Sequence, residues 1–396
     1  MFVNYFADDR RDTPVNRAVA RFIIGGWLCW KTAMYDWRLF LEAPTMQTSA
    51  FAWAIPPVAP GLILELERLL LLGLLVGFMA GYRIRLTGFL AAVLVAHLGT
   101  VRMTQITSGE SESLFIGVYV LLLFALFADE DELSVDGMRR LGRRSAGEIG
   151  DRLEENPVHR HGALRWSLVV FALIYFGSGF DKVFHDGLTR PSLSFAAPEN
   201  LARWTVLYRP DGPLQFVTTS PVLMRLGAVG ALGLELGFLI AVLAGITVTP
   251  FMLGLLVFTA SNVLLLGIHF VDVYFLVAAF VAWDGALARL QPDEELLVTY
   301  DPDHRRTRVG VAGTAMLDAT NAVGFVPAGD PTADQLPPES TLAVRTGESV
   351  HHDRDAASVL AQQLRLTAPL ASLLSQGGDT ATVHDSNVGR EKPPQE

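Results

Sequence analysis

Long apolar runs separated by short polar turns dominate the first three quarters of this chain. A run of roughly 18 to 20 apolar residues is long enough to cross the hydrocarbon of a bilayer as a helix. The pattern predicts eight membrane helices, near residues 18–37, 61–81, 86–105, 113–129, 164–182, 222–245, 249–267 and 270–288. The last two are separate only if the chain turns near Gly267; otherwise residues 251–283 form one tilted helix.

The pattern changes after Gln291, where short apolar stretches alternate with polar ones. LLVTYD, VGFVP and TLAVRTG favour strands, residues 308–320 and AASVLAQQLRL favour helices, and His351 and His352 are expected in a solvated turn. These elements predict a small α/β domain over residues 291–375, followed by a disordered polar tail over residues 376–396. The fold class is therefore an all-α polytopic membrane bundle, residues 1–290, joined to a small α/β domain.

The arginines predict how the bundle is oriented. They gather in the N-terminal segment, in the turn near residue 83 and in the loop after the fourth helix, which alternation places on one side. The positive-inside rule makes that side cytoplasmic, so both termini of this multi-pass protein are expected in the cytoplasm. The first helix is expected to act as an uncleaved signal anchor. The loop 183–221 on the opposite side contains Trp204, Tyr208 and several prolines, and is expected to form a folded cap.

Composition narrows the possible functions. Hydrophobic residues make up 51 % of the chain and the mean hydropathy is +0.34, as in membrane proteins. The net charge is -10 and no basic stripe exists, which argues against a nucleic-acid partner. The acidic, arginine-rich composition is typical of a halophilic microbe. The single cysteine, Cys29, excludes an internal disulfide and a CxxC redox pair, and no histidine spacing suggests a metal site.

Lysine is rare, since only Lys31, Lys182 and Lys392 occur among 31 basic residues. Lys182 stands at the end of the apolar segment IYFGSGFDKVFHDG. An amine can lose its proton and act as a base or nucleophile, which a guanidinium cannot do. Alternatively, Lys182 is an interfacial lysine whose amine snorkels out of the bilayer.

Polar side chains within the apolar runs are the other candidates, because each is costly in a membrane without a partner. Glu235 has no partner nearby in sequence and is expected to find one across the bundle, either Lys182 or an arginine of the outer loop. Glu65 and Arg68 are expected to form a structural ion pair. His97 and His269 are either acid–base groups or ligands, or they belong to hydrogen-bonded structure. A polar pocket near the outer leaflet is expected from the set Asp181, Lys182, His185, Asp186, Glu235, Asn262, His269 and Asp272.

Four segments, FADEDELSVDGMRR, YFGSGFDKVFHDG, ALGLELGFLIA and FTASN, resemble the HTTM domain, the membrane module shared by vitamin K-dependent gamma-carboxylase and many microbial proteins. The resemblance covers roughly residues 15–290 and is most specific at residues 134–137 and 175–187. In the carboxylase, a lysine of the matching GxxK segment is the proposed base that starts oxidation of vitamin K hydroquinone. The resemblance therefore implies that Lys182 acts as a base.

The chain departs from that family at two places. Glu112 and Ser113 stand where the family has an Asn-His pair, and Thr259 stands where the carboxylase has a histidine ahead of the asparagine that matches Asn262. No counterpart of the propeptide-binding lumenal domain is found. Glutamate carboxylation is therefore not expected, while a lipid quinone or a lipid-like substrate stays open.

The segments LLVTYDPDHRRT and TLAVRTGESVHHDRDAASVLAQQL are similar to the DCC thiol-oxidoreductase family, a thioredoxin-like domain often found beside HTTM. That family has two cysteines shortly after the Tyr-Asp pair, where this chain has His304 and Thr307. Disulfide exchange requires a dithiol. The resemblance therefore implies a degenerate, non-redox thioredoxin-like domain.

Three functions remain open. The first is a membrane enzyme that acts on an isoprenoid quinone or another lipid. The second is a non-catalytic scaffold or lipid-binding protein whose cytoplasmic domain binds a protein partner, and the third is a DoxX-like subunit of a quinone-linked oxidoreductase. For the first, the expected catalytic residues are Lys182, Asp181 and His185, and the expected substrate-binding residues are Glu235, Asn262, His269 and Trp204.

Overall fold

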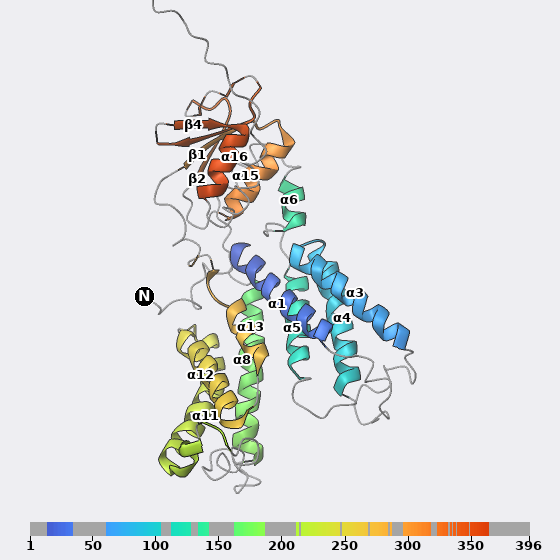
Figure 1. The fold of residues 1–396 in the computed structure, drawn as a ribbon, viewed down its shortest axis with the longest axis vertical. Helices are drawn as coiled ribbons and strands as arrows, with labels where there is room; N and C mark the ends of the chain where they lie inside the picture. Colours follow the sequence, from blue (N-terminus) through green and yellow to red (C-terminus); the bar gives the residue numbers. More distant parts are fainter. Residues whose placement is uncertain are drawn as a thin grey trace, which may run out of the picture. The chain divides into compact units, whose positions relative to one another are not determined.

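The computed structural model divides into two compact units (Figure 1). The helical unit falls within residues 1–144 and 154–286, and the sheet unit within residues 145–153 and 287–396. The structure describes residues 14–34, 61–103, 112–127, 134–141, 162–186, 211–213, 215–245, 248–267, 270–283, 286, 296–317, 323–331, 333–334, 336–337, 339–347 and 349–363.

The helical unit follows the apolar pattern of the sequence, with helix ends within a few residues of those predicted for all but the last helix. A short helix, α6, and a 3₁₀ turn at Gln215–Thr219 were not predicted. The α-helices are α1 (Pro14–Met34), α3 (Gly61–Ala80), α4 (Ile84–Met103), α5 (Glu112–Leu126), α6 (Val135–Leu141), α8 (Ala163–Asp181), α11 (Pro221–Leu243), α12 (Thr249–Leu266) and α13 (Val271–Ala279).

Four of the described helices are long and apolar enough to cross a membrane, over Ile84–Val101, Ala163–Phe184, Pro221–Leu243 and Thr249–Leu266. The other four predicted helices are present, but their described residues are too short or too charged to count as membrane spans. α5 and α13 have only 15 and 9 residues, short of the roughly 20 that a bilayer requires. α1 and α3 have the length, but each carries three charged residues, which are costly in hydrocarbon.

Gly267 ends α12, as the sequence suggested for a two-helix arrangement. It adopts the left-handed conformation, with φ 68° and ψ 13°, and its N–H donates to the carbonyl of Val263. A left-handed residue after the last helical turn is a common helix stop, and glycine adopts it without a steric penalty. Residues 249–279 therefore form two helices, and the second is much shorter than the predicted 270–288.

The segment Ser134–Gly137 has a structural role at the turn between α3 and α4. The Ser134 hydroxyl accepts a hydrogen bond from the Gly137 N–H at 2.9 Å, which caps α6. The Asp136 carboxylate accepts from the backbone N–H of Arg83, and the Gly81 carbonyl accepts from the Asp136 N–H. Gly81 has φ +70°, and an added Cβ would lie 2.3 Å from the Ser134 Cβ. Only glycine fits at residue 81.

The sheet unit is a mixed four-stranded sheet in the order β2-β1-β3-β4. β1 pairs parallel with β2 and antiparallel with β3, and β3 pairs antiparallel with β4. Helix α15 makes the crossover between the parallel strands β1 and β2. The elements are β1 (Leu296–Tyr300), α15 (Arg305–Leu317), β2 (Val323–Pro327), β3 (Leu342–Thr346), β4 (Ser349–His352) and α16 (Asp353–Gln363).

The sheet unit confirms the three predicted strands and both helices, and its core is formed by Val298, Tyr300, Val344, Ala356 and Leu360. The expectation of a solvated turn at His351 and His352 is wrong, since both lie in β4 opposite Val344 and Ala343. The sequence missed β4 because its alternating pattern is only four residues long. The predicted tail, residues 376–396, lies outside the described residues.

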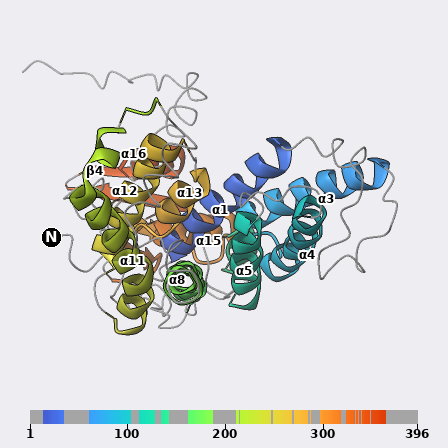
Figure 2. The ribbon, with the colours of Figure 1, turned by 90° about the horizontal axis from the view of Figure 1, so that it is seen from below.

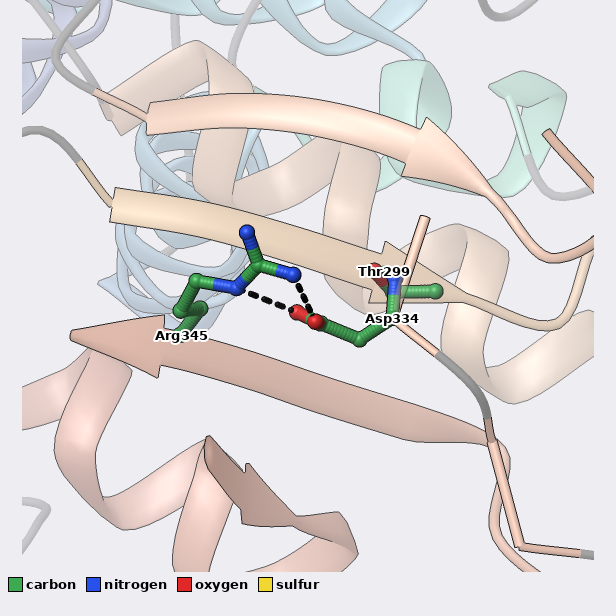
Figure 3. A network of polar contacts seen from close by, with 3 residues as sticks. All are labelled: Thr299, Asp334 and Arg345. Atoms are coloured by element: carbon green, nitrogen blue, oxygen red, sulfur yellow. Dashed lines mark hydrogen bonds and ion pairs between the residues drawn. The ribbon is translucent and has the colours of Figure 1, made fainter. Parts of the chain in front are cut away.

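An ion pair fastens the segment between β2 and β3 to the sheet (Figure 3). The Arg345 guanidinium donates two hydrogen bonds to the Asp334 carboxylate, one of them from Nε at 3.1 Å. The Asp334 N–H donates to the hydroxyl of the buried Thr299 at 3.1 Å. These hydrogen bonds and the charge of Asp334 hold the pKa of Arg345 above its usual value. This ion pair has a structural role, because the Arg345 guanidinium and the Asp334 carboxylate bind each other.

Candidate functional site

One face of α8 packs against α11 at unusually short range, and Figure 2 shows α8 end-on beside it. A Cβ added to Gly179 would lie 2.9 Å from the Cβ of Glu235, closer than real Cβ atoms approach. Glycine at residue 179 therefore brings the α11 backbone near enough for Glu235 to face the next turn of α8. This explains physically why a glycine stands three residues before Lys182.

Lys182 and Glu235 form an ion pair across this contact. The Lys182 Nζ donates to the Glu235 Oε1 at 2.5 Å. The side chain of Glu235 is 3 % exposed and that of Lys182 is 22 % exposed. The partner expected for Glu235 across the bundle is thus Lys182, and not an arginine.

The second oxygen of Glu235 is a buried acceptor. Oε2 is buried and has no hydrogen-bond partner among the residues that the structure describes. A buried carboxylate oxygen without a donor loses its hydration and gains nothing in return, which is costly. A ligand that carries an O–H or N–H group could supply the missing donor.

The lysine side chain points into the bundle. Glu235 lies fourteen residues after the start of α11, about 21 Å along the helix axis. Cβ atoms tilt toward the N-terminus of their helix, and the amine of Lys182 reaches back to the level of Gly179. The amine of Lys182 is therefore engaged by a buried acid of the neighbouring helix.

A π-helical turn begins at Lys182 itself and runs to Asp186. Such turns are rare and frequently occur at functional sites, because they re-aim side chains relative to a regular helix. Asp181, the last residue of α8, is exposed. Lys182 and Glu235 therefore meet without Asp181, whose relation to the amine the sequence left open.

A second buried ion pair lies between α1 and α13. Asp272 accepts from the Lys31 Nζ and from the Trp27 indole N–H, both at 2.6 Å. The side chains of Lys31 and Asp272 are mostly buried. Two of the three lysines of the chain are thus paired with acids inside the helical unit. The sequence pointed to Asp272 as a polar residue, but not to Lys31 or Trp27 as its partners.

The remaining candidates are dispersed. Asn262 is half-buried in α12, and its backbone carbonyl accepts from the N–H of Gly267. The side chain of His185, and all of Trp204 and His269, lie outside the described residues. The expected structural pair is confirmed, with Arg68 3.3 Å from Glu65.

His97 has a carboxylate beside it. Its Nδ1 lies 3.0 Å from Glu67 on the neighbouring helix α3, a hydrogen-bonded arrangement. No group of three or more metal-binding side chains occurs within the described parts of the chain.

In the sheet unit, the side chains of His304 and Thr307 are hydrogen-bonded to each other. The His304 Nδ1 lies 2.7 Å from the Thr307 hydroxyl, which donates to the Thr341 hydroxyl at 3.1 Å. The Thr341 N–H donates to Asp353 at 2.8 Å. The network joins the start of α15 to the start of α16 without a thiol. Burial alone would raise the pKa of Asp353, but hydrogen bonds from Thr341, Ser340 and Leu342 hold it below its usual value.

We expect acid to loosen this corner of the sheet unit. A carboxyl whose pKa is lowered by folding contributes stability above its unfolded pKa, and that contribution disappears as the pH falls through the folded pKa. Asp353→Asn should remove this dependence, read as hydrogen-exchange protection of β3 and α16 in the full chain after correction for intrinsic exchange. Asp355→Asn, an exposed carboxylate two residues later, is the control. Equal pH dependence in the wild type and Asp353→Asn would contradict the assignment.

Comparisons with known proteins give no relative: no family model, no curated protein and no solved structure matches the chain.

Proposed function

We propose that the helical unit is a membrane module that binds a lipid-soluble molecule with a weakly acidic hydroxyl group, and that Lys182 and Glu235 are its acid–base pair. The observation that carries the proposal is the buried contact between the Lys182 Nζ and the Glu235 Oε1. An isoprenoid quinol, or another lipid with a hydroxyl group, has the required chemistry. Its O–H can donate to the unpartnered Oε2 of Glu235.

Proton transfer within the pair makes the amine a base. When the proton of Lys182 moves to Oε1 of Glu235, both groups become neutral, and neutral groups are favoured in a membrane interior over charged ones. The ligand O–H then turns from Oε2 of Glu235 to the neutral amine, which takes its proton, and the ligand oxygen keeps the bonding electron pair. The resulting anion is stabilised by the new ammonium of Lys182. Arginine could not make the first transfer, because its guanidinium stays protonated.

The resemblance to the HTTM domain agrees with this proposal, since that family places a lysine in the same GxxK segment. We further propose that the sheet unit is a thioredoxin-like domain without redox function. Its strand order, with a parallel β1–β2 pair and an antiparallel β3–β4 pair, is compatible with such a fold. In this proposal the sheet unit binds a protein partner, and both chain termini lie in the cytoplasm.

Native mass spectrometry of gently extracted protein tests the ligand. The wild type should carry a co-purifying lipid or quinol, and Lys182→Arg and Glu235→Gln should reduce its occupancy at least tenfold, the effect of about 1.4 kcal/mol of lost binding free energy. Lys392→Arg, which changes the third lysine in the same way, is the matched control.

Two outcomes would reject the proposed site. Equal occupancy in the wild type and in both variants would place the ligand elsewhere. A wild-type protein without any ligand, bound instead to a second membrane protein, would favour the alternative of a non-catalytic scaffold.

A further inference from the structure

A pocket of about 310 Å³ lies between the beginning of α1, the end of α3 and the beginning of α6. Two polar residues line it, and both have hydrogen bonds within the protein. Nε of the buried Arg21 donates to the Met79 carbonyl at 3.3 Å, and the buried Ser134 hydroxyl accepts from the Gly137 N–H. The rest of the wall is apolar, and it includes Ala18, Phe22, Met79, Ala80, Val135 and Met138. A pocket of this size and lining suits a hydrocarbon chain.

Two arginines follow closely after residues of this pocket and share one aromatic ring. Arg139 comes directly after Met138, and Arg83 comes three residues after Ala80. Their guanidinium carbons lie 5.5 and 5.7 Å from the centre of the Tyr82 ring, and all three side chains are exposed. The ring contact itself uses no N–H donor, and a planar guanidinium binds phosphate oxygens through pairs of N–H groups. The chemistry beside the pocket is therefore that of a phosphate site.

The turn between α3 and α4 holds these arginines together. Arg83 has φ 46°, a left-handed conformation that is uncommon for a residue other than glycine. The Asp136 carboxylate accepts a hydrogen bond from the Arg83 N–H, and the Asp136 N–H donates to the Gly81 carbonyl at 3.3 Å. The turn that carries Arg83 and the helix that carries Arg139 are thus joined by the backbone, so both guanidinium groups are presented to one ligand.

The pocket lies at the end of a helix that is long and apolar enough to cross a membrane. That segment of α4 begins at Ile84, the residue after Arg83. Tyr82 and Arg83 therefore fall where hydrocarbon would meet the lipid headgroups, a level at which tyrosine is enriched. The arginine-rich side of the bundle is also the side expected to face the cytoplasm, where bilayers carry anionic lipids. A phosphate group at this level and a hydrocarbon chain beside it are both supplied by a phospholipid.

We propose that the pocket holds an acyl chain of an anionic phospholipid whose phosphate binds Arg83 and Arg139. Two positive charges favour an anionic headgroup over a zwitterionic one, because the second carries a cation of its own that the arginines repel. The proposal requires that the helical unit lies in a bilayer. It does not involve Lys182 or Glu235, which do not line this pocket.

Native mass spectrometry of the full-length protein in micelles tests the headgroup. The protein is titrated with phosphatidylglycerol or with phosphatidylcholine of the same acyl chains. The wild type should bind the first phosphatidylglycerol about thirtyfold more tightly, the effect of two arginines beside an anionic lipid. Arg83→Gln/Arg139→Gln should remove this preference and leave phosphatidylcholine binding unchanged. Arg225→Gln is the matched control, since Arg225 is an exposed arginine near the start of another apolar helix, α11.

Filling the pocket tests the acyl chain. Ala18→Phe places a ring where the chain would lie, so both lipids should bind about tenfold more weakly, the effect of excluding about two methylene groups. The preference for phosphatidylglycerol should persist. Ala260→Phe adds the same ring to an exposed residue of α12 and should change neither affinity. If Ala18→Phe does not fold, Ala80→Leu fills the pocket from the exposed end of α3.

Three results would overturn the proposal. The first is equal affinity of the wild type for the two lipids, as expected if the four acids at residues 129–132, outside the described residues, neutralise the arginines. The second is a preference that the double arginine variant retains, and the third is lipid binding that a filled pocket does not weaken. Lys182→Arg, which tests the proposed function, should leave phosphatidylglycerol binding unchanged, so the two proposals can fail separately.

Discussion

Lys182→Met is expected to lower the free energy of unfolding of the helical unit by about 3–5 kcal/mol, the usual cost of removing one partner of a buried ion pair. The cost arises because the Glu235 carboxylate stays buried, with its side chain 3 % exposed, and loses the amine at 2.5 Å. Reversible unfolding in mixed micelles measures it. Lys392→Met, the same change at the third lysine, should have no effect.

The double variant Lys182→Met/Glu235→Leu separates structure from function. Replacing both charges with apolar side chains should recover most of the lost stability, because no uncompensated charge remains. Ligand occupancy should not recover, because neither the amine nor the carboxylate is present. If Lys182→Met alone leaves the stability unchanged, the amine is not paired with Glu235 in the folded protein, and the snorkelling alternative returns.

Gly81→Ala is expected to have the second largest effect, at the turn between α3 and α4. A non-glycine residue in the left-handed conformation costs about 1–2 kcal/mol, and Gly81 has φ +70°. The new methyl group would also lie 2.3 Å from the Ser134 Cβ and 2.9 Å from Nη2 of the Arg21 guanidinium. Overpacking of this kind adds about 1–3 kcal/mol. The thermal unfolding midpoint in detergent should fall accordingly.

Gly73→Ala is the control for that substitution. Gly73 lies within α3, and nothing stands within 4 Å of an added Cβ. Since alanine has the higher helix propensity, by roughly 0.8–1 kcal/mol in exposed helices, this variant should be as stable as the wild type or slightly more stable. A similar loss in both variants would show that the turn does not depend on the contact with Ser134.

The apolar pattern predicted the helical unit well, because a run of apolar residues of the right length has few alternatives to a helix. Among the described residues the structure shows four of the eight predicted spans, and at the last predicted helix the difference has a local reason. Hydrophobicity continues past Ala279 to Trp283, but α13 stops at Ala279. The Trp283 indole N–H folds back and donates to the carbonyl of Ala278. Such a hydrogen bond depends on the path of the backbone, so the hydrophobic pattern of the sequence does not predict it.

The candidate site could be predicted only in part. Lys182 was conspicuous because lysine is rare, and Glu235 because an isolated acid in an apolar helix requires a partner. Their pairing depends on the close approach at Gly179, which one sequence does not display. The pair Lys31–Asp272 joins residues 241 positions apart.

The contact between Gly179 and Glu235 constrains how this chain can evolve. Any side chain larger than hydrogen at residue 179 pushes α11 away and separates the acid from the amine. If Lys182 is lost, Glu235 becomes a buried carboxylate without its amine. If Glu235 is lost, the close approach of α11 at Gly179 is no longer needed for the ion pair. We therefore expect Gly179, Lys182 and Glu235 to be kept together or to change together in related sequences.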